Sequence, residues 1–150
     1  MHLTQLPSVI KSTLEKAGFV AAEFNHELCE PGHLLIGILE MPPLRDNVAR
    51  KVLEDHHVTI DRLRKIVARR YPWNSDQNVA HIDSLSTETM DVLLKAEEIA
   101  QRDRNHLALM RLDHLLIALI EQDPVIAVIF VDLGVFPQDI LRRLTYELAG

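Results

Sequence analysis

The segment HLLIGIL, from His33 to Leu39, returns as HLLIALI from His114 to Ile120 in a chain of only 150 residues. In each copy the histidine is followed by six residues without a polar side chain, which is typical of a short helix buried on all sides. Further matches occur in the same order along the chain: LEKA at 14–17 with LLKA at 93–96, Asn25-His26 with Asn105-His106, and HHVTIDRLRKI from His56 with LGVFPQDILRRL from Leu133. Two apolar helices can look alike by chance, but agreement in order across many segments predicts a tandem duplication.

Apolar spacing and helix-start signals divide each copy into four helices. Apolar residues recur at steps of three and four along the first predicted helix: Ile10, Leu14, Ala17, Ala21, Phe24 and Leu28. Capping residues and prolines predict the helix starts: Ser8, Pro31, Asp46 and Thr59 in the first copy, then Ser86 or Thr87, the DHLLIALIE segment, Asp123-Pro124 and Pro137 in the second. Because no period-two run or Asn-Gly turn indicates a strand, we expect an all-α fold of eight helices, a pseudo-twofold tandem duplication.

The boundaries of the two copies follow from where this pattern stops and restarts. We expect one domain over residues 1–150, with repeat one at about 6–71 and repeat two at about 85–148. The segment PWNSDQNVAHIDS, residues 72–84, is rich in turn formers and has no sustained periodicity, so it is interpreted as a linker.

Composition narrows the functional classes. The formal net charge of −6 disfavours a nucleic-acid partner, because sequence-independent binding to phosphates depends on lysine and arginine. No apolar run is long enough to span a bilayer, and the N-terminus lacks the features of a signal peptide, so we expect no membrane partner and a cytoplasmic location. The single cysteine, Cys29, fits a reducing compartment.

The doubled pattern resembles the Clp N-terminal repeat, which occurs in double copy at the front of Clp-type AAA+ unfoldases. The resemblance rests on a long helix with alanines four residues apart, an Asn-His pair and a following HLL, and it covers residues 6–148. It implies an all-α domain without catalytic residues, cofactors or metal that binds substrate proteins or adaptor proteins for an ATP-driven partner. Such a domain delivers protein segments to the motor or acts as a free-standing regulator. The motor's GxxxxGK[ST] phosphate loop is absent from this sequence.

The sequence departs from the resembled family at a site where some members bind phosphoarginine. Those members place a Thr at the start of each half and a Glu directly before the histidine of HLL. Here the first half has Pro7 and Gly32, whereas the second has Ser86 and Asp113. A carboxylate can pair with a guanidinium, and a hydroxyl with helix N-terminal amides can hold phosphate. Phosphoarginine-marked protein is therefore expected as a partner in the second half only, with Ser86 as a helix cap and Asp113 as a first-turn acid as the alternative interpretation.

A second functional class, a small helical metal-binding protein, is suggested by two Glu-x-x-His spacings. They are Glu23 with His26 and Glu30 with His33, which resemble the paired motif of di-iron bundles. Pro31 lies inside the second spacing at a predicted helix start, so its Glu and His are not expected to share a helical face. We therefore favour His33 and His114 as hydrogen-bonded imidazoles at helix starts and predict no metal ligands.

The predicted partner-binding surface lies where the resemblance places the starts of the two first helices, near the pseudo-twofold axis. The candidate contact residues are Leu3, Leu6, Lys11, Leu85, Ser86 and Asp113. Apolar residues clustered with a polar rim are typical of protein interaction surfaces. The alternative is that Leu6 and Leu85 are core residues that hold the first helices in place.

Overall fold

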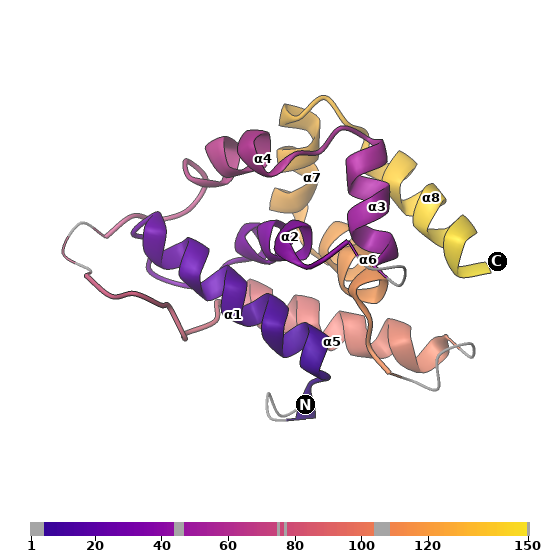
Figure 1. Cartoon of the computed structure of the whole chain (residues 1–150), viewed down its shortest axis with the longest axis horizontal. Coiled ribbons are helices and arrows are strands. Elements are labelled where there is room, and N and C mark those ends of the chain that lie inside the picture. Colours follow the sequence, from indigo (N-terminus) through magenta and orange to yellow (C-terminus); the bar gives the residue numbers. More distant parts are fainter. Residues whose placement is uncertain (1–4, 44–46, 75, 77, 104–108, 150) are drawn as a thin grey trace.

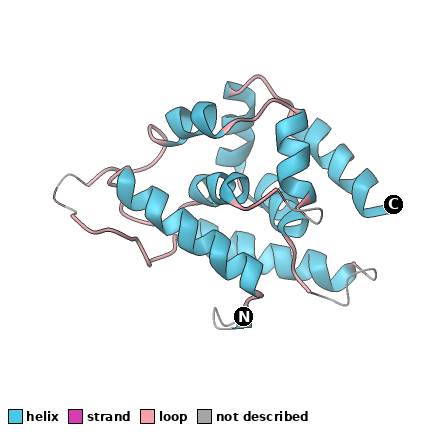
Figure 2. Cartoon of the chain, in the orientation of Figure 1, coloured by secondary structure: helices cyan, strands magenta, loops and turns pink. Residues whose placement is uncertain are grey.

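The computed structural model describes residues 5–149 apart from 44–46, 75, 77 and 104–108. Within these residues the chain forms eight α-helices and no β-strand (Figure 1, Figure 2), so the predicted all-α class is confirmed. The first half holds α1 (Ser8–Glu23), α2 (Pro31–Glu40), α3 (Val48–Asp55) and α4 (Ile60–Val67). The second half holds α5 (Thr87–Arg102), α6 (Leu112–Gln122), α7 (Pro124–Asp132) and α8 (Pro137–Ala149).

Most helix starts coincide with the predicted capping residues. The side chains of Thr59, Ser86 and Asp123 each accept a backbone N–H from the first turn of α4, α5 and α7. Each cap satisfies one of the donors that a helix start leaves without an intrahelical partner. Helix α3 differs, because Asp46 lies outside the described residues and the cap is Asn47, whose Oδ1 accepts the N–H of Arg50 at 3.0 Å.

The repeated histidine has the same local role in both halves. The Nδ1 of His33 accepts the backbone N–H of Glu30 at 2.8 Å, and the Nδ1 of His114 accepts that of Arg111 at 2.9 Å. Both imidazoles are fully buried. Each one satisfies a backbone donor at a helix start, which confirms the predicted role of these two histidines.

Helices α2 and α6 form the centre of the core (Figure 1). Every residue from Pro31 to Leu39 and from Leu112 to Ile120 is buried. Helix α1 packs on α2, α5 packs on α6, and α2 and α6 contact each other. The absence of a polar face in the two HLLI segments is therefore explained by neighbours on every side.

Contacts between the two halves occur in related pairs. Helix α2 contacts α7 as α6 contacts α3, and α4 contacts α7 as α8 contacts α3. The ion pairs follow the same rule, since Arg143 of α8 pairs with Asp55 of α3 at 2.9 Å and Arg70, after α4, pairs with Asp132 of α7. Reciprocal contacts of this kind are what a twofold relation between similar units requires, and the predicted pseudo-twofold arrangement is confirmed.

The described part of segment 72–84 contains no helix and runs along α1. The N–H of Ile82 donates to the carbonyl of Gly18 at 3.1 Å, and His81 Nε2 lies 2.9 Å from the carbonyl oxygen of Glu15. These bonds hold the segment against α1 on its path from the end of α4 to the start of α5.

No single described helix is both long and apolar enough to cross a membrane. Helices α6 and α7 together reach that length and apolarity, but they are bent by 96° relative to each other.

Candidate functional site

The residues of the predicted binding surface are only partly exposed, and Leu85 lies beside Cys29, which follows the end of α1. Leu6 is 6% exposed and belongs to the buried core, so the alternative interpretation as a core residue describes it. Leu85 is half-buried and packs against the same core, whereas Lys11 is exposed on α1. Leu3 lies outside the described residues. Of these four, Lys11 and Leu85 are the ones that the structure shows to be accessible to a partner.

Ser86 acts as a structural cap rather than as an open polar group. Its Oγ accepts the N–H of Thr89 at 3.1 Å, and its own N–H donates to the carbonyl of Cys29 at 3.1 Å. The hydroxyl of Thr89 donates to the same carbonyl at 2.8 Å. These bonds tie the start of α5 to the segment that precedes α2 and leave Ser86 3% exposed.

Asp113 lies far from Ser86. Its Oδ1 accepts the N–H of His114 at 2.9 Å, its Oδ2 lies 3.4 Å from Nη2 of Arg111, and the residue is 2% exposed. The Nε2 of His114 lies 2.8 Å from Oδ2 of Asp103, which follows the last residue of α5. Asp113 is therefore near the end of α5, and Ser86 is at its start. The 16 residues between span about 24 Å at 1.5 Å per residue. The two groups expected to share a phosphoarginine site are thus too far apart to do so.

Gly32, where some members of the resembled family have a glutamate, lies against the ring of Tyr71. The hydroxyl of Tyr71, a residue that follows α4, accepts the N–H of Gly32 at 3.0 Å. A Cβ at position 32 would lie 2.9 Å from Cε2 of the Tyr71 ring, which is closer than van der Waals contact. A glutamate at this position would therefore require the Tyr71 ring to shift. The tyrosine also occupies a helix N-terminal amide that could otherwise hold phosphate.

Three of the four groups of the alternative metal site, Glu23, His26 and His33, already have other hydrogen-bond or ion-pair partners. Glu23 pairs with Nη2 of Arg64 at 2.6 Å, and both ring nitrogens of His26 and of His33 have hydrogen-bond partners. Helix α1 ends at Glu23, and Asn25 has a φ of 56°, so Glu23 and His26 do not share a helical face. Among the described residues no three His, Cys, Asp or Glu side chains are grouped to hold a metal ion. The geometry gives the Glu-x-x-His hypothesis no support.

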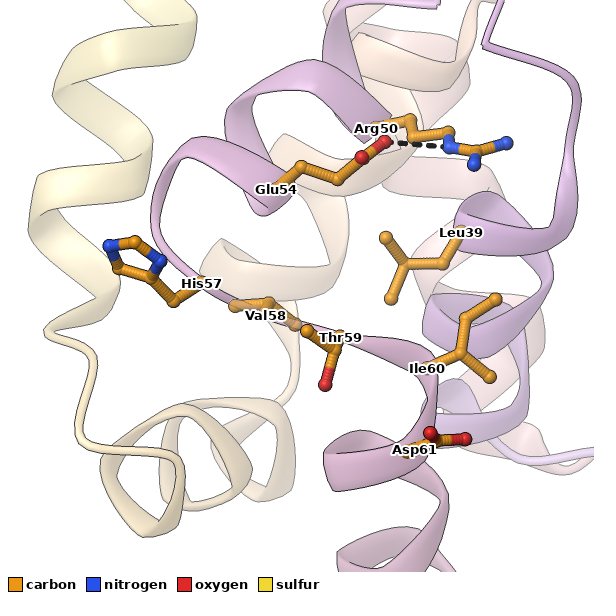
Figure 3. A pocket seen from close by; sticks show the side chains of 8 residues that line it. All are labelled: Leu39, Arg50, Glu54, His57, Val58, Thr59, Ile60 and Asp61. Carbon is orange, nitrogen blue, oxygen red and sulfur yellow. Dashed lines mark hydrogen bonds and ion pairs between the residues drawn. The ribbon is translucent and has the colours of Figure 1, made fainter.

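A pocket of about 320 Å³ lies between the end of α2, helix α3 and the start of α4 (Figure 3). Its lining residues are Leu39, Arg50, Glu54, His57, Val58, Thr59, Ile60 and Asp61. Leu39 and Val58 are buried and Ile60 is half-buried, and these three form an apolar floor between the carboxylates of Glu54 and Asp61. The volume is at the lower limit of roughly 300–1,000 Å³ for small-molecule sites. The pocket therefore suits a single side chain better than a larger ligand.

The turn between α3 and α4 contributes His57, Val58 and Thr59 to the lining of this pocket. His57 has a φ of 63°, and the N–H of Val58 then donates back to the carbonyl of Leu53 at 2.9 Å. Thr59 caps α4 immediately afterwards. Sequence reasoning identified this cap but missed the pocket, because the contact of α2 with α4 is what brings Leu39 to Ile60.

Comparisons with known proteins bear on this geometry. No protein-family model and no curated protein matches the sequence. The N-terminal domain of the caseinolytic protease associated chaperone ClpD from Arabidopsis thaliana has a TM-score of 0.74 at 17% identity, covering 100% of this chain and 98% of that one. The Hsp104 N-terminal domain from Candida albicans has a TM-score of 0.71 at 19% identity, covering 93% and 88%. A ClpV N-domain solved with a VipB peptide has a TM-score of 0.66 at 20% identity, covering 97% and 88%. This chain therefore has the fold of Clp-type N-terminal domains, as its sequence resemblance predicted.

Proposed function

We propose that this chain is a single non-catalytic domain that binds segments of substrate or adaptor proteins for a Clp-type AAA+ unfoldase. It delivers them to the motor or regulates the motor as a free-standing protein. The observation that carries the proposal is the likeness to N-terminal domains of such chaperones along nearly the whole chain. The ClpV N-domain in complex with a VipB peptide supports a protein segment as the ligand class.

Binding of an unfolded protein tests the proposal directly. Fluorescence anisotropy would follow fluorescein-labelled lysozyme, reduced and carboxymethylated so that it stays unfolded, as the full chain is titrated in. We expect saturable binding, with native labelled lysozyme as the matched control binding at least about tenfold more weakly. Equal binding of both forms, or of neither, contradicts the proposal. Turnover of ATP or of a peptide by the pure chain, lost on mutation of its own residues, contradicts the non-catalytic part.

The two accessible residues of the predicted surface provide a second test. Lys11→Gln and Leu85→Ser are each expected to weaken binding of the unfolded protein about fivefold, the effect of a modest hot spot of about 1 kcal/mol. Leu94→Ser is the matched control, since Leu94 is 43% exposed on the same helix, α5, that Leu85 precedes. An equal loss in the control would show that general surface apolarity, not this surface, determines binding.

A further inference from the structure

The charges around the pocket between α2, α3 and α4 are unevenly compensated. Nε of Arg50 donates to Oε1 of Glu54 at 2.7 Å, and its Nη1 donates to the carbonyl of Met41 at 2.5 Å, so this cation and Glu54 neutralise each other. Asp61 is exposed in the first turn of α4 and takes part in no ion pair among the residues that the structure describes. Figure 3 shows its carboxylate beside Ile60, at the opposite edge of the apolar floor from Glu54. Asp61 is therefore the rim carboxylate without an ion pair, and the guanidinium of the neighbouring Arg62 is bonded to the carbonyl oxygens of His57 and Leu133 instead.

The second half shows that the fold does not require this charge. Residues 77 positions apart correspond in this region, because Val52 and Leu53 of α3 match Ile129 and Phe130 of α7, all four fully buried. At the same spacing the rim positions of Glu54 and Asp61 become Val131 and Gln138. Val131 is 61% exposed. The matching place in the second half thus carries a valine and a neutral glutamine, so the fold forms there without either rim carboxylate.

We propose, building on the proposed function, that this pocket receives the side chain of an arginine or lysine in the bound protein segment. The methylene stem lies on Leu39, Val58 and Ile60, and the cationic head lies at Asp61. Long cationic side chains bury their stems on apolar surface while the charge stays in water. Arginine is the better fit of the two because its planar guanidinium can donate two parallel hydrogen bonds to one carboxylate. The net charge of −6 favours the approach of such basic segments.

Methyl-detected NMR of the full 150-residue chain tests the site with defined probes. The probes are acetyl-Ala-Ala-Xaa-Ala-Ala-amide peptides in which Xaa is arginine, lysine, norleucine or glutamate. We expect the arginine peptide to shift the methyl signals of Leu39, Val58 and Ile60, the norleucine peptide to do so more weakly, and the glutamate peptide not at all. Methyl signals of Val131 in the second half serve as an internal control and should not distinguish arginine from glutamate.

A charge-neutralising variant isolates the role of Asp61. Asp61→Asn should weaken binding of the arginine peptide about two- to fivefold, which is the size of an exposed ion pair, and leave norleucine binding unchanged. Asp91→Asn removes the same charge from an exposed position on α5 and should retain wild-type affinity. Equal affinity of the arginine and glutamate peptides, pocket methyl signals that do not move, or the same loss in both variants overturns the proposal.

The result of the peptide experiment can be distinguished from the result of the lysozyme-binding test of the proposed function. If unfolded lysozyme binds while the pocket methyl signals do not respond to the arginine peptide, the pocket assignment fails and the protein-binding function stands. If the pocket discriminates arginine from glutamate while unfolded lysozyme does not bind, the pocket assignment stands and the broader function fails.

Discussion

At the scale of single residues, a buried chain of hydrogen bonds holds two histidines neutral. The N–H of Glu30 donates to Nδ1 of His33, so this nitrogen carries no proton. Nε2 of His26 lies 3.0 Å from the carbonyl oxygen of Ala68, which can only accept, so this nitrogen carries the proton. The 2.7 Å contact between the rings must then run from Nε2–H of His33 to Nδ1 of His26. Every ring nitrogen is satisfied with both imidazoles uncharged, and a further proton on either ring would break one bond.

This arrangement predicts loss of stability in mild acid. Burial lowers the pKa of His26, and burial with the neighbouring His26 lowers the pKa of His33 to about 3. The unfolded chain binds protons at these residues below about pH 6.5 while the folded chain does not. Acid therefore favours the unfolded state, and the free energy of unfolding should fall by up to about 1.4 kcal/mol per pH unit for each histidine. Urea unfolding between pH 7.5 and 5 measures this slope.

The carboxyl groups of Glu30 and Asp123 have the opposite effect on the free energy of unfolding as the pH falls. Burial raises the pKa of Glu30 and of Asp123, so these groups bind protons more tightly in the folded chain and stabilise it as the pH falls through their raised values. The difference in slope between wild type and His33→Gln isolates the histidine pair, and the variant should be flatter. His57→Gln, which changes an exposed imidazole, should keep the wild-type slope. Identical slopes in wild type and His33→Gln would refute the assignment.

Two corresponding turns differ in how they tolerate a left-handed backbone. His57 has a φ of 63° and Gly134, 77 residues later, has a φ of 79°. A side chain strains this conformation, whereas glycine adopts it freely. His57→Gly should therefore raise the free energy of unfolding by about 0.5–1 kcal/mol, and Gly134→Ala, whose Cβ would meet no neighbour within 4 Å, should lower it by about 1 kcal/mol. Thermal or denaturant unfolding measures both, and a destabilised His57→Gly would contradict the strain argument.

At the scale of helices, the main difference between HLLIGIL and HLLIALI has a packing cause. Position 37 is glycine and the matching position 118 is alanine. A Cβ at Gly37 would lie 2.8 Å from the backbone carbonyl oxygen of Thr13, so α1 lies closer to α2 than an alanine allows. The second pair, α5 on α6, accommodates an alanine at the same place.

Substitution at this contact should move a helix rather than a side chain. Gly37→Ala gains about 1 kcal/mol of helix propensity, but displacing α1 costs about 1–3 kcal/mol. We expect a net destabilisation of about 1 kcal/mol in urea unfolding, with altered chemical shifts along α1. Ala118→Gly is the reciprocal control: it should lose about 1 kcal/mol of helix propensity, with a further loss from the buried methyl group, and leave the shifts of α1 unchanged. A Gly37→Ala variant more stable than wild type would show that α1 and α2 are not in such close contact.

At the scale of the whole molecule, neither half covers its own central helix. Helix α2 contacts α6 and α7 of the other half, and α6 in turn contacts α2 and α3. Separating the halves would expose apolar surface on helices that are buried from end to end. Because each buried leucine or isoleucine contributes about 1.5–3 kcal/mol, and small domains are only marginally stable, the loss should exceed what one half can sustain.

Fragments test this dependence. The separate peptides 1–84 and 85–150 should show little helix by circular dichroism and no cooperative urea transition, whereas the full chain unfolds in one. Mixing the fragments in equal amounts should restore helix content, because the reciprocal contacts can re-form between chains. A cooperative transition in either isolated fragment would contradict the shared core.

The local features of this molecule were predictable from its sequence. The starts at Thr59, Ser86 and Asp123, the imidazoles of His33 and His114, and the burial of α2 and α6 follow from short-range spacing and capping chemistry. The repeated order of segments predicted the pseudo-twofold fold, because similar segments in the same order form similar units.

Relations between distant segments were decided only by the tertiary structure. Packing puts Leu6 in the core, places Ser86 and Asp113 at opposite ends of α5, and lays Tyr71 over Gly32. Leu39 reaches Ile60 only through the contact of α2 with α4. The physical reason is that residue spacing specifies which face of a helix is apolar, whereas the neighbour that covers the face, and hence which polar groups meet, depends on how all eight described helices pack together.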